Sequence, residues 1–228
     1  MIGQRMSREE AQAFIDGAGN IRVMDHPVVA HKISLLRDEK TGTKECRELA
    51  REIAYLMMYE VTQNVPLELL EVKTPVTETK APFLSGKKPV AVEILRAGSY
   101  MVAGAQDFMP AIKTGSIGMY RQEDLTPKTY FCKLPQDSAE RRLYIMDPML
   151  ATGGSAIAAI TQIKERYQVP DEQMIMMSIF SAPEGIVALH RAHPNVKVLL
   201  GVVDEYLTDD GWIYPGMGDA GDRLSGVR

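Results

Sequence analysis

Short apolar runs alternate with segments of helical periodicity along the second half of the chain. The runs have the length of strands buried on both faces. They lie at residues 89–95, 143–146, 174–180 and 196–203. Between two of them, Ile157, Ile160 and Ile163 recur about one helical turn apart. Since strands that alternate with helices pair in parallel, the pattern predicts an α/β domain with a doubly wound, mainly parallel sheet.

The first half of the chain carries fewer strand signals. Residues 43–63 form the clearest helix, and we expect its Met and Tyr side chains in the core or in a subunit interface. A capping-box pattern that begins at Ser7 predicts a helix over 7–18. Pro27 marks the start of a further helix, after a short edge strand. Residues 65–80, with prolines among alternating Val and Thr, are typical of strands on a sheet edge.

One strand-to-helix junction carries chemistry beyond folding. The apolar run at 143–146 ends at Asp147, and the helix follows the turn Ala151–Ser155, which holds two glycines and two hydroxyl side chains. Glycine lets the backbone approach a ligand, and a helix N-terminus attracts anions. Because parallel sheets bind ligands at the carboxyl ends of strands, we predict a phosphate here, with Asp147 on the sugar hydroxyls. The alternative is an ordinary joint with Ser155 as the helix N-cap.

A second junction of the same kind follows the run at 89–95. Arg96 enters its turn, and a further strand pattern ends in Arg121. The guanidinium fork of arginine suits phosphate oxygens, so both side chains are candidates for a diphosphate site. The alternative is that they are solvated charges or surface ion pairs. The polar segment 122–128 is a candidate mobile loop.

The C-terminal segment 207–228 is rich in Gly, Pro and Asp. Gly216, Gly218 and Gly221 match a dinucleotide-binding fingerprint by letters, but too few residues follow for a βαβ unit. We therefore expect an irregular loop whose backbone groups recognise a small planar polar ligand. Together with the two junctions, this segment predicts a sugar-phosphate or nucleotide binder.

Composition narrows the class of protein. The chain has 228 residues and a net charge of -4, which fits one globular domain and gives no basic footprint for nucleic acid. No apolar run has the length of a membrane span, and no signal-peptide pattern opens the sequence. Cys46 and Cys132 fit no metal or redox spacing and indicate reduced thiols. His190 and His193 lie three apart but lack a third ligand nearby, so we expect no metal there.

Four blocks of the sequence resemble those of the uracil phosphoribosyltransferase family. Residues 145–155 resemble its signature for 5-phosphoribosyl 1-diphosphate (PRPP), with Ile145 where the family has valine. Residues 26–38 resemble its N-terminal block, 94–98 its diphosphate loop and 215–223 its uracil-binding loop. The resemblance thus runs from about residue 25 to the end of the sequence.

The resemblance implies that uracil and PRPP give UMP and diphosphate, a step of pyrimidine salvage, with Mg²⁺ carried by PRPP and no metal ligand from the protein. The catalytic residues that it implies are Asp147, Arg121 and Asp219. Those implied to bind PRPP are Arg96, Arg121, Asp147, Pro148, Met149, Leu150, Ala151, Thr152, Gly153, Gly154, Ser155 and Asp219. Those implied to bind uracil are Ile213, Gly218, Asp219 and Ala220. A lid over 122–134 would keep water out.

The same resemblance implies a type I phosphoribosyltransferase-like α/β fold, with a mainly parallel sheet flanked by helices and a small hood formed by the terminal segments. Within one domain over 1–228, we expect residues 1–24 to form an N-terminal extension and residues 204–228 the base-binding hood segment. The resemblance further implies a cytoplasmic homodimer or homotetramer that binds no nucleic acid or membrane, with GTP as a candidate allosteric activator.

Some positions depart from the family pattern. Glu93 replaces a proline and would repel a diphosphate if it faced one. Ser99-Tyr100 replaces a glycine-containing pair, and Trp212 and Tyr214 border the expected base pocket. Two alternatives follow: a phosphoribosyltransferase for another base, or a non-catalytic regulator that senses PRPP or a nucleotide. The regulator would bind PRPP yet release no diphosphate.

Overall fold

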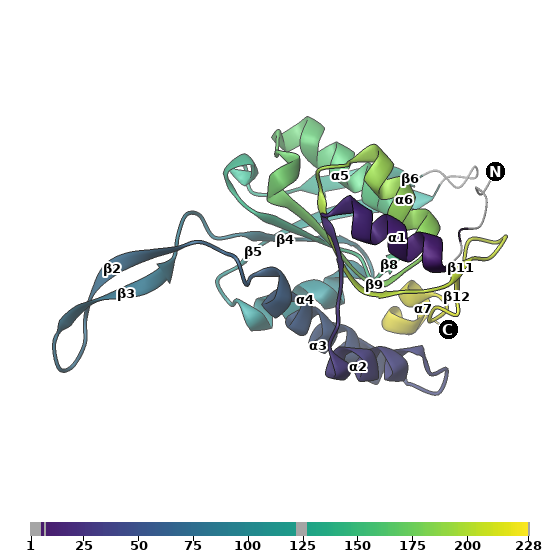
Figure 1. Cartoon of the computed structure of the whole chain (residues 1–228), viewed down its shortest axis with the longest axis horizontal. Coiled ribbons are helices and arrows are strands. Elements are labelled where there is room, and N and C mark those ends of the chain that lie inside the picture. The colour runs from purple at the N-terminus through teal and green to yellow at the C-terminus, as the bar shows by residue number, and fades with distance from the viewer. Residues whose placement is uncertain (1–5, 7, 122–126, 228) are drawn as a thin grey trace.

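A mainly parallel sheet runs through the middle of the molecule (Figure 1). The computed structural model describes residues 6, 8–121 and 127–227. Across the sheet the strands are β1 (Ile21–Val23), β10 (Lys197–Val203), β9 (Met174–Ser181), β7 (Leu143–Met146), β4 (Val90–Leu95), β5 (Lys113–Arg121) and β6 (Pro127–Lys133), and the short β8 (Met149–Leu150) also pairs with β9. Of these pairs, β5 with β6 is antiparallel and the others are parallel, which confirms the predicted sheet.

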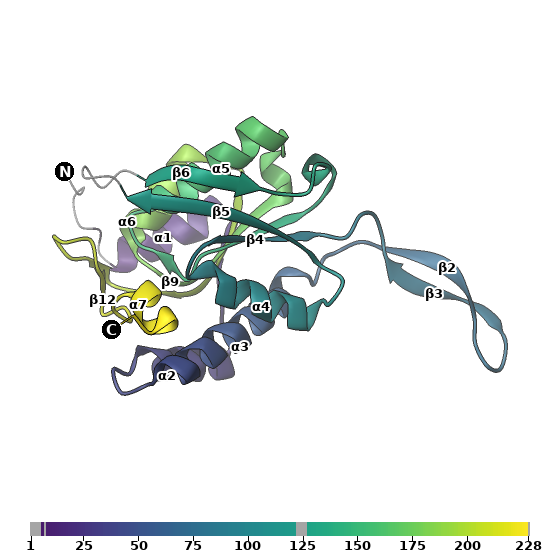
Figure 2. The same cartoon turned by 180° about the vertical axis from the view of Figure 1, so that it is seen from behind.

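Helices cover both faces of the sheet (Figures 1 and 2). On one face lie α2 (Pro27–Arg37), α3 (Thr43–Val61) and α4 (Gly98–Phe108); on the other lie α1 (Arg8–Ala18), α5 (Gly154–Tyr167) and α6 (Pro183–Ala192). Two short 3₁₀ turns follow: Ser138–Glu140 lies between β6 and β7, and Asp171–Gln173 lies between α5 and β9. The expected helix over 43–63 is confirmed as α3, and Met57 and Met58 lie in the core.

The central strands explain the apolar runs of the sequence. Successive side chains of a strand point to opposite faces. In β7, Tyr144 and Met146 pack in the α3–α4 layer, whereas Leu143 and Ile145 pack in the α5–α6 layer. All of β9 is buried in the same way, as predicted. A strand with a helical layer on each side has no solvent-facing positions, so its sequence shows no polar alternation.

Residues 65–80 form edge strands, as predicted, but they lie outside the main sheet. They belong to a separate antiparallel pair, β2 (Leu67–Lys73) with β3 (Glu78–Leu84), which projects away from the body (Figures 1 and 2). The turn between them is closed locally, because Oγ1 of Thr74 accepts hydrogen bonds from the N–H groups of Val76 and Thr77. This local turn favours a hairpin over pairing with a distant strand.

Residues 8–24 pack on the same domain as the rest of the chain. Ile15 of α1 and Ile21 of β1 are buried in the α5–α6 layer, and β1 pairs with β10 at the sheet edge, where an edge strand was expected. The ring of Phe14 meets the ring of His190 edge-on, with centroids 5.3 Å apart. Ser7, the expected helix cap, lies outside the described residues.

The C-terminal segment is more regular than the sequence predicted. It contains a two-stranded hairpin, β11 (Tyr206–Leu207) with β12 (Ile213–Tyr214), and the short helix α7 (Ala220–Ser225). The expected irregular loop is therefore wrong for part of the tail. The carboxylate of Asp219 accepts from the N–H of Asp222 and caps α7, a signal that the high glycine content obscured. Within the described residues, no helix combines the length and apolarity needed to span a bilayer.

Candidate active site

A cavity of about 540 Å³ opens at the carboxyl edge of the sheet. Three turns that are far apart in sequence line it: the β4–α4 turn, the β7–α5 turn and the C-terminal hood segment. The end of β5 and the facing part of β6 complete its wall. The cavity thus brings together the segments that the sequence singled out, at the edge where parallel sheets bind ligands. Its volume fits a small-molecule ligand.

The β7–α5 turn, where the sequence predicts a phosphate site, lines the cavity. Helix α5 begins at Gly154, and its N-cap, Gly153, has a φ angle of 82° and makes no side-chain capping bond. A Cβ at Gly153 would lie 2.9 Å from the carbonyl oxygen of Gly185, so glycine alone fits. The alternative with Ser155 as N-cap is wrong, since Ser155 lies inside the first helical turn. The N–H of Gly154 donates to Oγ1 of Thr152 at 3.4 Å, and because the N-cap residue has no side chain, an anion can bind at this helix N-terminus.

Asp147 lies at the end of β7 and lines the cavity. Its Oδ1 accepts a hydrogen bond of 3.4 Å from the N–H of Met149. The following backbone is tied to β9, because the carbonyl of Pro148 accepts from Phe180 and that of Leu150 from Ala182. Asp147 therefore stands on a segment fixed to the centre of the sheet. Of the predicted PRPP residues here, Pro148 is buried outside the cavity wall, and the others line it.

The β4–α4 turn brings Arg96 to the same cavity. The Leu95–Arg96 peptide bond is cis, and the carbonyl of Arg96 accepts from the N–H of Ser99 at 3.3 Å. The Arg96 side chain is exposed and lines the cavity. Arg121 ends β5, but its side chain lies outside the described part of the chain, as do residues 122–126 of the expected lid. The roles assigned to Arg121 and to the lid stay predictions.

The hood segment supplies a further part of the cavity wall. Ile213, Gly218, Asp219 and Ala220, the residues predicted to bind uracil, all line the cavity. Ile213 is buried in β12, and the other three residues form the start of α7 and the turn before it. The structure therefore brings the predicted base-binding backbone into the same cavity as the predicted phosphate site.

Further cavity residues were not named individually from the sequence, although Tyr130 lies within the expected lid over 122–134. Met119, Tyr120 and Tyr130 line it from β5 and β6. The rings of Tyr120 and Tyr130 lie 6.2 Å apart, and Tyr130 covers Gly118, where a Cβ would meet its ring at 2.5 Å. The position of Tyr120 at the carboxyl end of an expected strand was the available signal. The antiparallel return of β6, which brings Tyr130 back to this edge, carried no such signal.

The departures from the family pattern fall at different places. Glu93 accepts a hydrogen bond of 2.6 Å from Ser116 on the neighbouring strand and is not part of the cavity wall. The ring of Tyr100 lies 5.5 Å from the guanidinium of Arg47. Trp212 alone of these positions lines the cavity, with 44% of its surface exposed. The substitutions at Glu93 and Tyr100 are thus accommodated by packing rather than by the ligand site.

Other titratable groups have structural surroundings. Nε2 of His193 lies 3.2 Å from Oγ1 of Thr161, and burial lowers the pKa of this histidine. Burial also raises the pKa of the Cys46 and Cys132 thiols, which are unpaired. Across residues 8–121 and 127–227, no group of three or more His, Cys, Asp or Glu is arranged to hold a metal ion.

Comparison with known proteins places this geometry in a family. The model of the family described as uracil phosphoribosyltransferase matches residues 23–226. The uracil phosphoribosyltransferase of Thermoanaerobacter sp. (strain X514) is 53% identical over 210 residues, which cover 92% of this chain and 99% of the relative. The solved structure of the AQ2163 protein from Aquifex aeolicus has a TM-score of 0.85 and 33% identity, covering 91% of this chain and 98% of that chain.

A more distant structure confirms the fold. An adenine phosphoribosyl transferase from Trypanosoma brucei, solved with AMP, pyrophosphate and ribose-5-phosphate, has a TM-score of 0.54 at 13% identity and covers 88% of each chain. At this identity the likeness shows the type I phosphoribosyltransferase fold alone. The family model and the close relatives show more, since they cover the β7–α5 turn, the β4–α4 turn and the hood together. The chain belongs to the uracil phosphoribosyltransferase family.

Proposed function

We propose that the protein transfers the phosphoribosyl group of PRPP to uracil, giving UMP and diphosphate in pyrimidine salvage. One observation carries the proposal: a single cavity joins an anion cradle, an arginine and a turn of backbone amides and carbonyls. These are the recognition chemistries for a sugar phosphate, a diphosphate and a small polar base. Membership of the family supports the same reaction.

The cradle and Asp147 hold the ribose phosphate in this proposal. The N-terminus of α5 and the turn Ala151–Ser155 bind the 5-phosphate through backbone N–H groups and hydroxyls. Asp147 accepts hydrogen bonds from the ribose hydroxyls. Both are fixed to β9 and α5, so the anomeric carbon is held in place for attack by the base.

Departure of the diphosphate is the step that needs charge stabilisation. The transition state resembles an oxocarbenium ion, and negative charge grows on the leaving diphosphate. Arg96 and Arg121 donate hydrogen bonds to it. Mg²⁺ would be carried into the cavity by the oxygens of PRPP, and the cavity wall fits such an ion because the carboxylate of Asp147 lines it. When bound, Mg²⁺ supplies further neutralisation of the leaving group.

The hood segment recognises the base in this proposal. The backbones of Ile213, Gly218 and Ala220 hydrogen-bond uracil, and Asp219 lies close to both substrates. Trp212 borders this pocket and is the feature that favours the second candidate, a phosphoribosyltransferase for another base. The non-catalytic regulator is less well supported, because Glu93 bonds Ser116 rather than lining the diphosphate region.

Diphosphate release with PRPP and Mg²⁺ tests the proposal, with uracil, cytosine, orotate and the purine bases offered separately. Uracil-selective release is the expected result. Release with another base alone would move the specificity to that base. PRPP binding without release for any base would support the regulator. Fluorescence of Trp212, the one tryptophan of the chain, reports PRPP binding independently of turnover.

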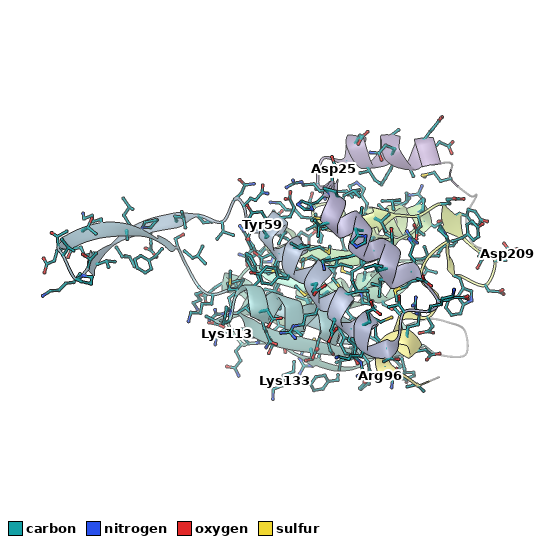
Figure 3. All side chains as sticks on the ribbon, turned by 90° about the horizontal axis from the view of Figure 1, so that it is seen from below. Asp25, Tyr59, Arg96, Lys113, Lys133 and Asp209 are labelled. Atoms are coloured by element: carbon teal, nitrogen blue, oxygen red, sulfur yellow. The ribbon has the colours of Figure 1, made fainter. Side chains whose placement is uncertain are left out.

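We also propose a homodimer or homotetramer in which the β2–β3 hairpin meets a second copy. Apolar side chains lie along the hairpin, among them Leu69 at 66% and Val76 at 92% exposure, and side chains point from both of its faces (Figure 3). A two-stranded hairpin alone is marginally stable in water, so a partner surface is expected to cover it. Light scattering should show a smaller assembly for Leu69→Lys; an unchanged mass would place the interface elsewhere.

The remaining proposals are a cytoplasmic location and activation by GTP. The free thiols of Cys46 and Cys132 fit a reducing compartment. Activation by GTP is supported by the family resemblance alone. Initial rates with and without GTP at subsaturating PRPP test it directly, with ATP as the matched control.

A further inference from the structure

Two arginines, Arg37 and Arg223, donate hydrogen bonds to the hood loop that precedes α7. Arg37, the last residue of α2, donates from Nη1 to Oδ2 of Asp204 at 2.9 Å and from Nη2 to its Oδ1. The same Nη1 donates to the carbonyl oxygen of Gly216 at 2.7 Å. Oδ2 of Asp204 in turn accepts from the N–H of Gly216 at 3.1 Å. The ion pair therefore binds both polar groups of one residue in the loop.

Gly216 is the point where this loop leaves β12. Its φ angle is 56°, and a Cβ there would lie 2.2 Å from the carbonyl oxygen of Ile213, so the backbone turns sharply at a position that only glycine fits. Gly218, Asp219 and Ala220 of the cavity wall follow directly. A shift at Gly216 would therefore move the whole base-binding turn.

Arg223 of α7 fastens the other side of the loop. Its Nη1 donates to the carbonyl of Met217 at 3.0 Å and to that of Leu36 at 2.7 Å, and its Nη2 donates to the carbonyl of Asp38 at 2.6 Å. The last carbonyls of a helix lack partners within the helix, so Arg223 also caps the end of α2. The end of α2, the carboxyl end of β10 and the hood loop are thus joined in one unit.

The burial of the pair indicates a role in geometry more than in global stability. The Asp204 side chain is 4% exposed and that of Arg37 24%, and the Arg37 guanidinium lies 4.8 Å from the ring centre of Phe180. Desolvation of two such charges offsets much of their attraction. The pair instead fixes the orientation of the loop relative to β10. The guanidinium of Arg37 and the carboxylate of Asp204 are both planar, and Asp204 directly follows β10.

We propose that Arg37, Asp204 and Arg223 are positioning residues for the base. They fix the position of the loop 216–220 relative to the ribose site. This inference rests on the proposed function. Because the phosphate cradle stands on α5 and β9, their loss should weaken the use of uracil and leave the use of PRPP nearly unchanged.

The test compares Arg37→Lys and Arg223→Lys with Arg51→Lys. Lysine keeps the positive charge, so Asp204 is not left uncompensated, but it cannot reach two acceptors as the fork does. Arg51 is the matched control, since it makes a two-pronged ion pair with Asp107 between α3 and α4, away from the cavity. Steady-state kinetics give KM for each substrate, and hydrogen exchange reports the amides of 215–221.

The expected result for Arg37→Lys and Arg223→Lys is a KM for uracil that rises about tenfold or more, a KM for PRPP within about twofold of wild type, and faster exchange in 215–221. Arg51→Lys should change none of these. An equal rise in both KM values, or an unchanged KM for uracil in a folded variant, would overturn the proposal.

Two safeguards keep the test decisive. If Arg37→Lys loses its circular dichroism signal, Arg223→Lys decides by the same criteria. If the wild-type protein forms no UMP, the proposed function fails, but hydrogen exchange still tests the contacts. Unchanged exchange of 215–221 in both variants would then overturn the positioning role, and faster exchange confined to that segment would support it.

Discussion

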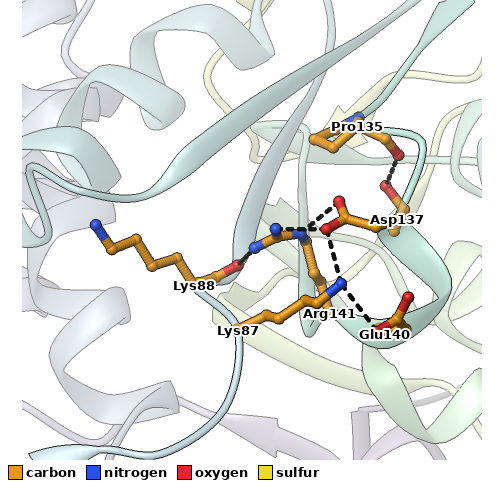
Figure 4. Close-up of polar contacts among 7 residues, drawn as sticks. Lys87, Lys88, Pro135, Asp137, Glu140 and Arg141 are labelled. Carbon is orange, nitrogen blue, oxygen red and sulfur yellow. Dashed lines mark hydrogen bonds and ion pairs between the residues drawn. The ribbon is translucent and has the colours of Figure 1, made fainter.

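Two arginine–aspartate pairs lie at opposite ends of the strands of the sheet, one at the amino ends (the amino edge) and one at the carboxyl ends (the carboxyl edge). They differ in which segments they join. At the amino edge, Arg141 donates from Nε and Nη2 to Asp137 at 2.7 Å each, and from Nη1 to the carbonyl of Lys88 at 2.6 Å (Figure 4). At the carboxyl edge, Arg37 forms a similar fork with Asp204. The partners are four residues apart in the first pair and 167 in the second.

Their surroundings differ as well. The ammonium of Lys87 lies 3.0 Å from Asp137 and 2.9 Å from Glu140 (Figure 4). The charged groups of the amino-edge cluster therefore pair with one another rather than with a ligand site. The pair of Arg37 with Asp204 instead holds a loop that borders a cavity. The same kind of ion pair can thus stabilise a fold when its partners are local in sequence, and can position a ligand site when it joins distant segments.

The largest effect is expected from the double variant Asp147→Asn, Arg96→Ala at the carboxyl edge. It removes a ribose acceptor and a donor to the leaving diphosphate, so the rate of UMP formation should fall about 10³-fold or more. The melting temperature should change little, since Arg96 is exposed. Initial rates and thermal unfolding measure the two quantities. A similar loss of rate in Arg141→Lys would contradict the division between the edges.

A smaller effect on activity is expected from Trp212→Ala. Loss of aromatic surface beside the base should raise KM for uracil about threefold to tenfold, with kcat nearly unchanged. Tyr214→Ala is the control, because Tyr214 stacks on Tyr206 at 4.9 Å outside the cavity wall. Equal KM values for both variants would show that Trp212 does not contact the base.

At the amino edge, Arg141→Lys should lower stability and spare catalysis. Arg141 is buried, and lysine cannot replace its bonds to Asp137 and to the Lys88 carbonyl together. We expect a melting temperature several degrees lower, with kcat and both KM values within about twofold of wild type. A change in KM for either substrate would show that the amino edge communicates with the cavity.

The smallest effect is a pH dependence at Asp137. Hydrogen bonds from Arg141, and then from Lys87, hold the pKa of this carboxyl well below its usual range. A carboxyl group whose pKa is lower in the folded state than in the unfolded state stabilises the fold at pH values above its unfolded pKa of about 3.9. This contribution to stability is lost as the pH falls toward the folded-state pKa. Asp137→Asn should therefore melt below wild type at neutral pH, and the difference in melting temperature should begin to narrow below about pH 4 and shrink further as the pH falls. A difference independent of pH would contradict this cause.

The sequence was sufficient where structure is local. The stretch around Asp147 to Ser155 combines a buried strand, a glycine turn and a helix, so its secondary structure followed from periodicity and turn residues, and its phosphate site stays a prediction. The parallel sheet followed in the same way. The specific substrate came from the resemblance to a family, since an anion cradle alone suits many phosphates.

Long-range contacts could not be predicted. Nothing local marks Arg37 as a partner of Asp204, because only the packing of α2 against the sheet brings them together. Tyr130 reaches the cavity because β6 runs antiparallel to β5. The strands β2 and β3 pair with each other rather than with the main sheet, and a hydrogen bond from Thr77 to Thr74 closes the turn between them. In each case tertiary packing decided between arrangements that the local sequence allowed equally.

The central claim is tested most directly by UMP formation from labelled uracil and PRPP with Mg²⁺, in wild type and in the Asp147→Asn, Arg96→Ala double variant. We expect rapid, PRPP-dependent formation of UMP and diphosphate in equal amounts by wild type, and a rate about 10³-fold lower in the variant. No UMP from wild-type protein that still binds PRPP, or equal rates for the two proteins, would contradict it.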